Sequence, residues 1–284
     1  MQANSEATGD DAYPPEELLD VAVFAATAAV RVIDDAVGGR TSLVWEEKGS
    51  ADFVTEVDKA AESAIADVIR AHCPEATIIG EELSPEGSLT SRGISFIVDP
   101  LDGTTNFLHG YPEYSVSIAV TDGTDLAAGV VRNLTKDETF TAVRNGGAYL
   151  NGQRIAVSRE SNPARALIGT GFPFKRHDLL EEYARQFVHV SRQTAGIRRA
   201  GSAALDLSNL ACGRFDGFWE LVLAPWDIAA GVLIIREAGG VVTNLDGTTK
   251  AISHGSVVAG NPDIHPWLLR TVQAAFGDHA LLAQ

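Results

Sequence analysis

The strongest constraint on the fold is an apolar run that ends in two closely spaced acids. The sequence ISFIVDPLDGTTNF occupies residues 94–107, and its first five residues are nearly all apolar. Such a run is typical of a strand that is covered on both faces. Asp99 and Asp102 follow this run, and Pro100 favours an extended conformation at Asp99. Because carboxylates this close repel each other, the pattern indicates a bound cation at the carboxyl end of a buried strand.

The residues beside this pair suit a hard cation and an anionic ligand. Gly103 lets the backbone turn close to a ligand, and the amides of residues 103–105 can point at an anion, as those of a helix start do. The carbonyl of Leu101 is a further oxygen ligand between the acids, and oxygen ligands without Cys or His favour Mg²⁺. The candidates for additional acids are Glu81, Glu82 and Asp227. A surface acid at Glu81 and a helix N-cap at Asp227 remain alternatives at this point.

Strand-like and helix-like segments alternate along the chain, and much of the strand pairing reads as antiparallel. This pattern predicts an α/β (α+β) fold with alternating layers of helix and sheet. A polar seam near residues 150–165 predicts one domain, 1–284, in two halves of about 14–155 and about 156–284, after a loose tail at 1–13. Helices are predicted at 16–37, from about 55 to 72, at about 178–192, within 200–212, at 226–238 and at 265–276. Strands are predicted at 76–80, 94–99, 114–133 (a hairpin), 138–157 (a meander), 164–171, 196–199, 214–220, 241–244 and 255–260.

Charge and cysteine content limit the possible partners and the location of the protein. The formal net charge is −16, which argues against direct binding of nucleic acid or of an anionic membrane. The two cysteines, Cys73 and Cys212, share no metal-ligand spacing and are expected to be free thiols. The start of the chain lacks a basic region before an apolar stretch, and no apolar run reaches membrane-spanning length. We therefore expect a soluble, cytoplasmic protein.

Four motifs, taken in order along the chain, resemble those of one enzyme family. DFVTEVD, GEE, DPLDGTTNF and WDIAAG resemble the inositol monophosphatase family of metal-dependent, lithium-sensitive sugar phosphatases, and the likeness runs from about residue 15 to 265. KGSADFVTEVDKAAE is especially similar to the bacterial inositol-1-monophosphatases. The resemblance implies a layered α-β-α-β-α fold with mixed, largely antiparallel sheets. It also implies a homodimer, dependence on two or possibly three Mg²⁺ ions, and inhibition by Li⁺.

The resemblance assigns metal ligands to particular residues of this chain. It implies that Glu81, Asp99 and the Leu101 carbonyl hold a first Mg²⁺, and that Asp99, Asp102 and Asp227 hold a second. Asp99 would then bridge the two ions. A third, weaker site would use Glu81 and water. These ions would neutralise the crowded carboxylates, which would explain why a strand ends in charges that repel each other.

The resemblance also implies direct attack of water on phosphorus. The first metal would lower the pKa of the water, which Glu81 and Thr104 would orient, while Asp58 would bond to Thr104 and take up the proton. Phosphate oxygens would bind to the amides of Gly103, Thr104 and Thr105. The alcohol part of the substrate would meet Gly201, Ser202, Ala203, Glu220 and Asp227. Weaker candidates near the water or the metals are Lys48, Asp52 and Glu82.

These expectations lead to a phosphomonoester hydrolase acting on myo-inositol 1-phosphate or a similar polyol or sugar monophosphate. Three sibling substrates stay open, because the metal acids do not discriminate among them: histidinol phosphate, fructose 1,6-bisphosphate and 3′-phosphoadenosine compounds. A phosphatase-fold protein with a regulatory, protein-binding role is an alternative from another class. In that case an acidic surface would suit a basic protein partner.

Overall fold

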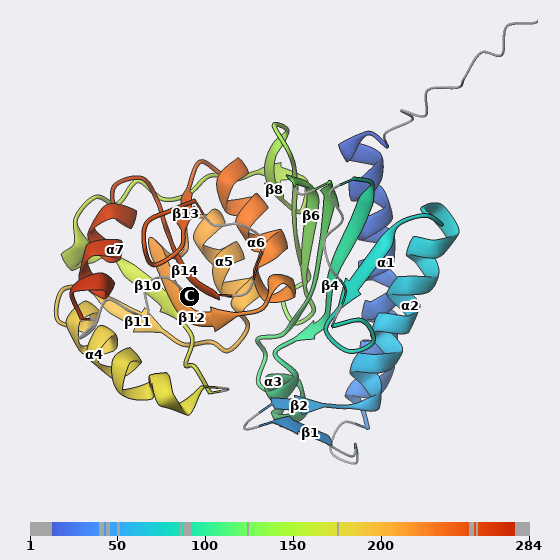
Figure 1. The fold of residues 1–284 in the computed structure, drawn as a ribbon, viewed down its shortest axis with the longest axis horizontal. Coiled ribbons are helices and arrows are strands. Elements are labelled where there is room, and N and C mark those ends of the chain that lie inside the picture. The colour runs from blue at the N-terminus through green and yellow to red at the C-terminus, as the bar shows by residue number, and fades with distance from the viewer. Residues whose placement is uncertain are drawn as a thin grey trace, which may run out of the picture.

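Five layers of secondary structure lie side by side across the molecule, in the order helix, sheet, helix, sheet, helix (Figure 1). The computed structural model describes residues 13–39, 43, 46–49, 52–85, 87, 92–123, 125–174, 176–249, 253 and 255–275, and the side chains of residues 47–49, 52 and 53 lie outside that description. The layer order and the mixed sheets confirm the predicted fold class. The predicted tail at 1–13 lies outside the described residues except for Tyr13.

The first two layers are a helix pair and a seven-stranded sheet. Helices α1 (Pro15–Val37) and α2 (Glu56–His72) cover one face of the sheet. Strand β3 pairs with β4 in parallel, and each later neighbour is antiparallel. The strands follow one another in chain order as β3 (Thr77–Gly80), β4 (Ile94–Asp102), β5 (Ser115–Asp122), β6 (Asp125–Asn133), β7 (Glu138–Val143), β8 (Gly147–Leu150) and β9 (Gln153–Arg154).

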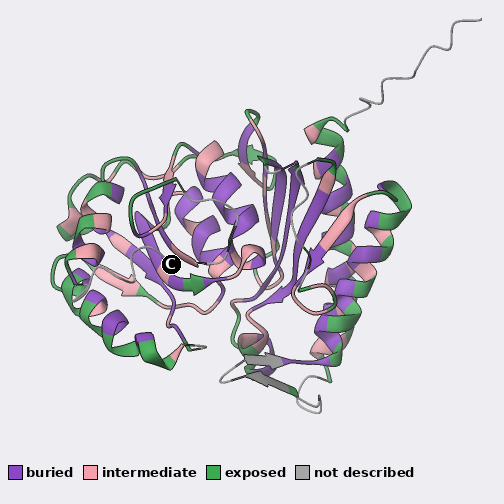
Figure 2. Cartoon of the chain, in the orientation of Figure 1, coloured by how far each residue is buried: buried purple, intermediate pink, exposed green. Residues whose placement is uncertain are grey.

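The remaining three layers are built from the second half of the chain. Helices α5 (Ala203–Ala211) and α6 (Pro225–Glu237) lie between the two sheets, and α6 is apolar nearly all round because both of its sides are covered. The second sheet has the order β11 (Gly196–Arg198), β10 (Leu167–Thr170), β12 (Gly217–Leu223), β14 (Gly255–Gly260) and β13 (Val241–Thr243). Helices α4 (Leu180–Ser191) and α7 (His265–Ala274) close the far side. Buried residues accordingly gather in the sheets and in α5 and α6, while the outer helices expose one face (Figure 2).

The short helix α3 (Thr104–His109), which was not among the predicted helices, follows β4 directly. The predicted hairpin at 114–133 is confirmed, with Asp122–Gly123 at its turn. A two-stranded hairpin, β1 (Glu46–Gly49) with β2 (Asp52–Val54), was not predicted, because the sequence there reads as an exposed loop.

One Asp-Gly pair departs from the turn that such a pair usually forms. The Asp216–Gly217 pair reads as a turn, but Gly217 begins strand β12. The buried Asp216 instead accepts hydrogen bonds from the Leu167 backbone at 2.7 Å and from the Ser158 hydroxyl at 2.5 Å. The neighbouring residues in the sequence do not show whether an aspartate forms a turn or accepts hydrogen bonds from distant segments.

Two further expectations concern cysteines and membrane spans. Cys73 is buried, Cys212 is half-buried and both are free thiols, as predicted. Among the described residues, no helix combines the length and the apolar character that a membrane crossing requires.

Candidate active site

The paired acids lie at an irregularity in the pairing of β4 with β5. Asp99 is paired with Ser117 and Asp102 with Ser115, so the register shifts between them. Asp99 is 1% exposed and Asp102 is 9% exposed. The Leu101 backbone N–H donates to Asp99 Oδ1 at 3.0 Å. A single neutral donor leaves the charge of a buried carboxylate largely uncompensated.

The electrostatics of Asp99 show which other acids approach it. Burial raises the pKa of Asp99 well above its ordinary value, and the nearby carboxylates of Glu81, Asp102 and Asp227 raise it further. Among the described residues, the neighbours that contribute most to this pKa shift include no basic side chain. These acids come from three parts of the chain, and Glu81, Asp102 and Asp227 all lie near enough to Asp99 at the end of β4 to act on its charge, as the metal hypothesis requires.

Asp102 connects the end of β4 to residues in the second half of the chain. Its Oδ2 accepts a hydrogen bond from the Ser202 hydroxyl at 2.6 Å and another from the Ala204 backbone at 2.8 Å. Ser202 is the N-cap of α5, and its hydroxyl also accepts a bond from the Leu205 backbone at 3.3 Å. The carboxylate of Asp102 thus stabilises the first turn of α5 while it faces the acid cluster.

Asp227 lies at the third position of α6, not at its N-cap. Its Oδ2 accepts a hydrogen bond from the Ala224 backbone at 2.7 Å, so the residue closes the first turn of the helix from inside. The N-cap alternative for this residue is therefore wrong in detail, although its position at the start of an apolar helix is as predicted. This bond fixes the carboxylate near the end of β4.

The acid cluster has the right chemistry for a hard cation, but it is not already arranged as a cage. Among the residues that the structure describes, no three or more His, Cys, Asp or Glu side chains have the spacing of a metal site. Asp102 and Asp227 each turn one carboxyl oxygen toward protein donors. A carboxylate has about four acceptor positions, so these bonds do not use up its capacity for a cation. Oxygen ligands alone, around a buried Asp99 whose main electrostatic neighbours among the described residues are acidic, fit Mg²⁺.

Thr104 lies between an acid of α2 and the end of β4. Its hydroxyl is 2.8 Å from Asp58 Oδ1 and 3.1 Å from the Leu101 carbonyl oxygen. Asp58 Oδ2 accepts two further bonds, from the Thr55 backbone at 2.9 Å and the Thr55 hydroxyl at 2.6 Å. Burial raises the pKa of Asp58, and the bonds from Thr55 and Thr104 oppose that rise. The predicted contact between Asp58 and Thr104 is present, and it gives the threonine hydroxyl a fixed acceptor.

A buried acid that the sequence did not single out holds the Glu81–Glu82 turn. Glu62 of α2 is 1% exposed, and its two carboxyl oxygens accept bonds from the backbones of Glu82 at 2.8 Å and Leu83 at 3.0 Å. A side chain at Gly80 would place its Cβ 2.0 Å from Glu62 Oε1, so only glycine fits there. Glu62 shares the apolar face of α2 with Ile65, Ala66 and Ile69, and an acid on that face was the available signal.

Glu220 is the residue expected to bind the alcohol part of the substrate. This half-buried residue lies directly against Gly171, where a Cβ would come within 1.9 Å of Glu220 Oε1. Burial raises the pKa of Glu220 to about 8; the Arg199 guanidinium opposes the rise, and Asp227 and Asp102 add to it. The four acids and Glu220 therefore belong to one electrostatic neighbourhood. The sequence also missed Asp206 of α5, which is 1% exposed and whose pKa is raised well above its ordinary value by burial and by Glu220.

The remaining predicted site residues differ in how the structure places them. Gly103 has a φ of 97°, and a Cβ there would be 3.0 Å from the Glu113 carbonyl, so a glycine is required. Gly201 has a φ of 95° and directly precedes the Ser202 cap. Thr105 is exposed on α3, and the backbone of Glu82 is committed to Glu62. The side chains of Lys48 and Asp52 lie outside the described residues.

Comparison with known proteins agrees with this geometry. A sequence model of the inositol monophosphatase family matches residues 15–276. The chain belongs to the inositol monophosphatase family. Similar curated proteins include one from Pseudomonas aeruginosa named Nus factor SuhB, which is 43% identical over 91% of this chain and 96% of its own length. An inositol-1-monophosphatase from Rhizobium meliloti is 43% identical over 90% of this chain and 96% of its own length.

Solved structures of this family share the fold. The extragenic suppressor protein suhB of Bartonella henselae superposes with a TM-score of 0.85 at 38% identity, covering 92% of this chain and 100% of the other. An inositol monophosphatase from Anabaena superposes with a TM-score of 0.80 at 36% identity, covering 91% of this chain and 96% of the other. The resemblance inferred from the four motifs is therefore confirmed over nearly the whole chain.

Proposed function

We propose that this protein is a Mg²⁺-dependent hydrolase of polyol or sugar phosphomonoesters, with myo-inositol 1-phosphate as the leading substrate. The observation that carries the proposal is the proximity of Glu81, Asp102 and Asp227 to a buried Asp99, whose main electrostatic neighbours in the described part of the chain are all acidic. Such a cluster is costly to keep charged unless cations offset it. Membership of the inositol monophosphatase family supports a phosphatase.

Glu81, Asp99, Asp102, Asp227 and the Leu101 carbonyl are the residues that would hold the cations. When bound, Mg²⁺ supplies positive charge to the phosphate oxygens and makes a nearby water more acidic. Asp99 is the natural shared ligand because it is the most enclosed of the four acids and is shifted by all three others.

Thr104 and Asp58 would position the attacking water and receive its proton. The Thr104 hydroxyl donates to Asp58, which leaves its oxygen lone pairs directed at a water beside the phosphate. As the water loses a proton to Thr104, the threonine passes its own proton to Asp58 Oδ1. Asp58 is suited to accept it because burial raises its pKa, while two bonds from Thr55 hold the carboxylate in place.

The alcohol part of the substrate would lie toward Glu220 and the segment of Gly201, Ser202 and Ala203. A carboxylate accepts hydrogen bonds from hydroxyl groups, and Glu220 is fixed against Gly171 within reach of the acid cluster. This favours a small polyhydroxylated substrate. A substrate panel would distinguish this substrate from three alternatives, which are histidinol phosphate, fructose 1,6-bisphosphate and 3′-phosphoadenosine compounds.

The test is phosphate release from a panel of polyol, sugar and nucleotide monophosphates, measured with Mg²⁺, with Mn²⁺ and with added Li⁺. We expect hydrolysis that requires a divalent cation, that is inhibited by Li⁺ and that is lost in Asp99→Asn. Hydrolysis that persists after removal of divalent cations with EDTA, or that survives in Asp99→Asn, contradicts the proposal. Analytical ultracentrifugation of the same preparation tests the expected homodimer.

A protein-binding role is a second candidate, favoured by the relatives named Nus factor SuhB. The acidic net charge suits a partner with a basic surface. Affinity capture with wild-type protein and with Asp99→Asn separates this role from catalysis. Recovery of the same purified partner by both proteins, followed by reconstitution from the two pure components, supports a role independent of turnover, and failure of reconstitution refutes it.

A further inference from the structure

The side chain of Arg199 has an unusual environment for an arginine in a strongly acidic protein. Its guanidinium carbon lies 5.2 Å from the ring centre of Phe172 and 5.0 Å from that of Phe174. Within the described part of the chain no acid forms an ion pair with it, and its buried Nε has no hydrogen-bond partner. The charge is therefore held by two aromatic rings, while N–H donors stay available to a ligand.

The aromatic rings that hold Arg199 are themselves fixed. Phe172 packs edge-on against Phe174 at 5.5 Å and against Tyr183 at 5.2 Å. Tyr183 stacks on the buried Trp219 at 5.9 Å, and its hydroxyl lies 3.0 Å from the Thr170 hydroxyl. Phe172 is thereby anchored in the core, and Phe174, which is 42% exposed, is positioned by its contact with Phe172. This group of Arg199, Phe172 and Phe174 is called the arginine clamp below.

The arginine clamp lies on the alcohol side of the candidate site. The Arg199 guanidinium acts electrostatically on Glu220, Asp102 and Asp206, and it opposes the rise that burial causes in the pKa of each. A Cβ at Gly201 would come within 2.6 Å of Arg199 Nη1. The clamp rings also follow Gly171 in the chain, the residue against which Glu220 rests. The clamp and Glu220 therefore border the same region.

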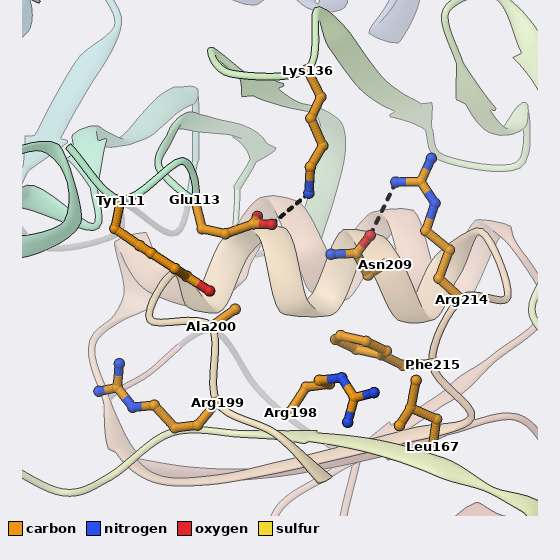
Figure 3. Close-up of a pocket in the computed structure, with 10 residues that line it drawn as sticks. All are labelled: Tyr111, Glu113, Lys136, Leu167, Arg198, Arg199, Ala200, Asn209, Arg214 and Phe215. Carbon is orange, nitrogen blue, oxygen red and sulfur yellow. Dashed lines mark hydrogen bonds and ion pairs between the residues drawn. The ribbon is translucent and has the colours of Figure 1, made fainter. Parts of the chain in front are cut away.

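The neighbouring Arg198 provides an internal comparison. Arg198 and Arg199 both line a pocket of about 330 Å³, together with Lys136 and Arg214, but their side chains extend to opposite sides of it (Figure 3). Arg198 is exposed, and its Nη1 donates to the Ile197 carbonyl at 3.0 Å. It shares the charge and the chain position of Arg199 but not the aromatic support or the proximity to Glu220.

We propose that Arg199 is a specificity-determining residue that binds a second anionic group on the alcohol part of the substrate, such as a second phosphate. The proposal rests on the proposed function, because it assumes that the reacting phosphate lies at the Asp99 end. A planar guanidinium supported on its faces offers its edge to two oxygens of a phosphate, as bidentate pairs do. The clamp would thus favour bisphosphates over the corresponding monophosphates.

The test uses two matched pairs of compounds and two matched variants. The pairs are myo-inositol 1-phosphate with myo-inositol 1,4-bisphosphate, and fructose 1-phosphate with fructose 1,6-bisphosphate. We expect wild-type kcat/KM to be about tenfold or more higher for the bisphosphate of at least one pair, as a charge-assisted hydrogen bond implies. Arg199→Gln should remove that preference, mainly through KM, whereas Arg198→Gln should retain it. Arg199→Lys should retain part of it, because lysine keeps the charge but not the planar fork.

Each other outcome overturns the proposal or separates it from the proposed function. Equal kcat/KM within both pairs, a preference that survives in Arg199→Gln, or an equal loss in Arg198→Gln each contradicts the clamp. If Arg199→Gln lowers kcat/KM equally for both members of a pair and also lowers Tm, the arginine only stabilises the segment that carries Phe172 and Phe174. If the wild-type protein hydrolyses none of the four compounds, the proposed function fails, and calorimetric titration with the same compounds decides the clamp by its effect on Kd alone.

Discussion

The hydrogen bond between Thr104 and Asp58 makes a sharp prediction about the variant Asp58→Asn. In the native site, Asp58 Oδ2 accepts two bonds from Thr55, and Oδ1 accepts the Thr104 hydroxyl at 2.8 Å. An asparagine satisfies the Thr55 donors only if its oxygen replaces Oδ2, so its NH₂ group must face Thr104. The threonine hydroxyl then has to accept that bond and donate to the Leu101 carbonyl, which lies 3.1 Å away.

This reversal should remove the proton acceptor without dismantling the site. The reoriented hydroxyl has a lone pair occupied by the amide, and asparagine cannot take up a proton, so we expect kcat to fall by roughly 10²- to 10⁴-fold on general-base magnitudes. KM should change by less than about threefold, because no group that would contact substrate is altered. The free energy of unfolding should change by less than about 1 kcal/mol, because each hydrogen bond is replaced and a buried charge is removed.

The assay is phosphate release under saturating Mg²⁺, together with urea denaturation of the same preparation. Glu56→Gln is the matched control, because it removes the same charge from the same first turn of α2 at an exposed position. Turnover of Asp58→Asn within threefold of wild type would refute the proton-transfer role. An equal loss in Glu56→Gln would assign the effect to the general charge of the helix start instead.

Three further predictions concern buried or strained residues. Glu62→Gln leaves one backbone donor of the Glu81–Glu82 turn unpaired and should lower the free energy of unfolding by about 1–3 kcal/mol. The variant should also need more Mg²⁺ for activation of phosphate release. An unchanged activation curve would contradict the role of Glu62. Glu220 has a pKa raised from 4.5 to about 8, so its stabilising contribution is present below about pH 4.5 and is lost as the pH rises through 8. The free energy of unfolding of Glu220→Gln should therefore equal that of wild type near pH 4.5 and exceed it near pH 9 in EDTA. The full pKa shift sets an upper limit of about 5 kcal/mol on this difference, and the actual difference should be smaller because water partly reaches the carboxylate. Equal pH profiles of Tm would refute this prediction. Val222 is 37% exposed and has a φ of 58°, which is a strained conformation for a β-branched residue. Val222→Gly should therefore raise the free energy of unfolding by roughly 1 kcal/mol, or Tm by about 2 °C, and Val222→Ala should give a smaller gain. A lower Tm for the glycine variant would contradict the strain.

The parts of the fold that the sequence predicted are those set by local patterns. The period of apolar residues predicts α1 and the start of α2 at Thr55, because capping and burial of one face are visible within a single segment. The run from Ile94 predicts a buried strand for a similar reason. The order of the layers also follows, since alternating elements with apolar faces have few ways to cover one another.

The residues that sequence reasoning missed are those whose partners are far away along the chain. Glu62 lies 20 residues from the Glu82 backbone that it binds, and Asp216 lies 49 residues from Leu167. A buried acid of this kind is recognised by its acceptor geometry, which no local pattern encodes. The hairpin β1–β2 was missed because its sequence lacks the alternation of a half-buried strand.

The bonds of Asp102 connect assembly of the acid cluster with docking of the two halves. Its carboxylate accepts the N-cap hydroxyl of α5, and Asn106 next to it donates to the carbonyls of Glu113 at 2.6 Å and Ala200 at 2.9 Å. These bonds join β4 and α3 to the segment that begins α5, so Asp102 reaches its place only when both halves are packed together. A substitution at Asp102 would consequently change the helix cap, the packing of the halves and the charge of the cluster at once. Asp58 and Thr104 make contacts within the first half alone, which is why loss of turnover in their variants can be attributed to chemistry and loss in an Asp102 variant cannot.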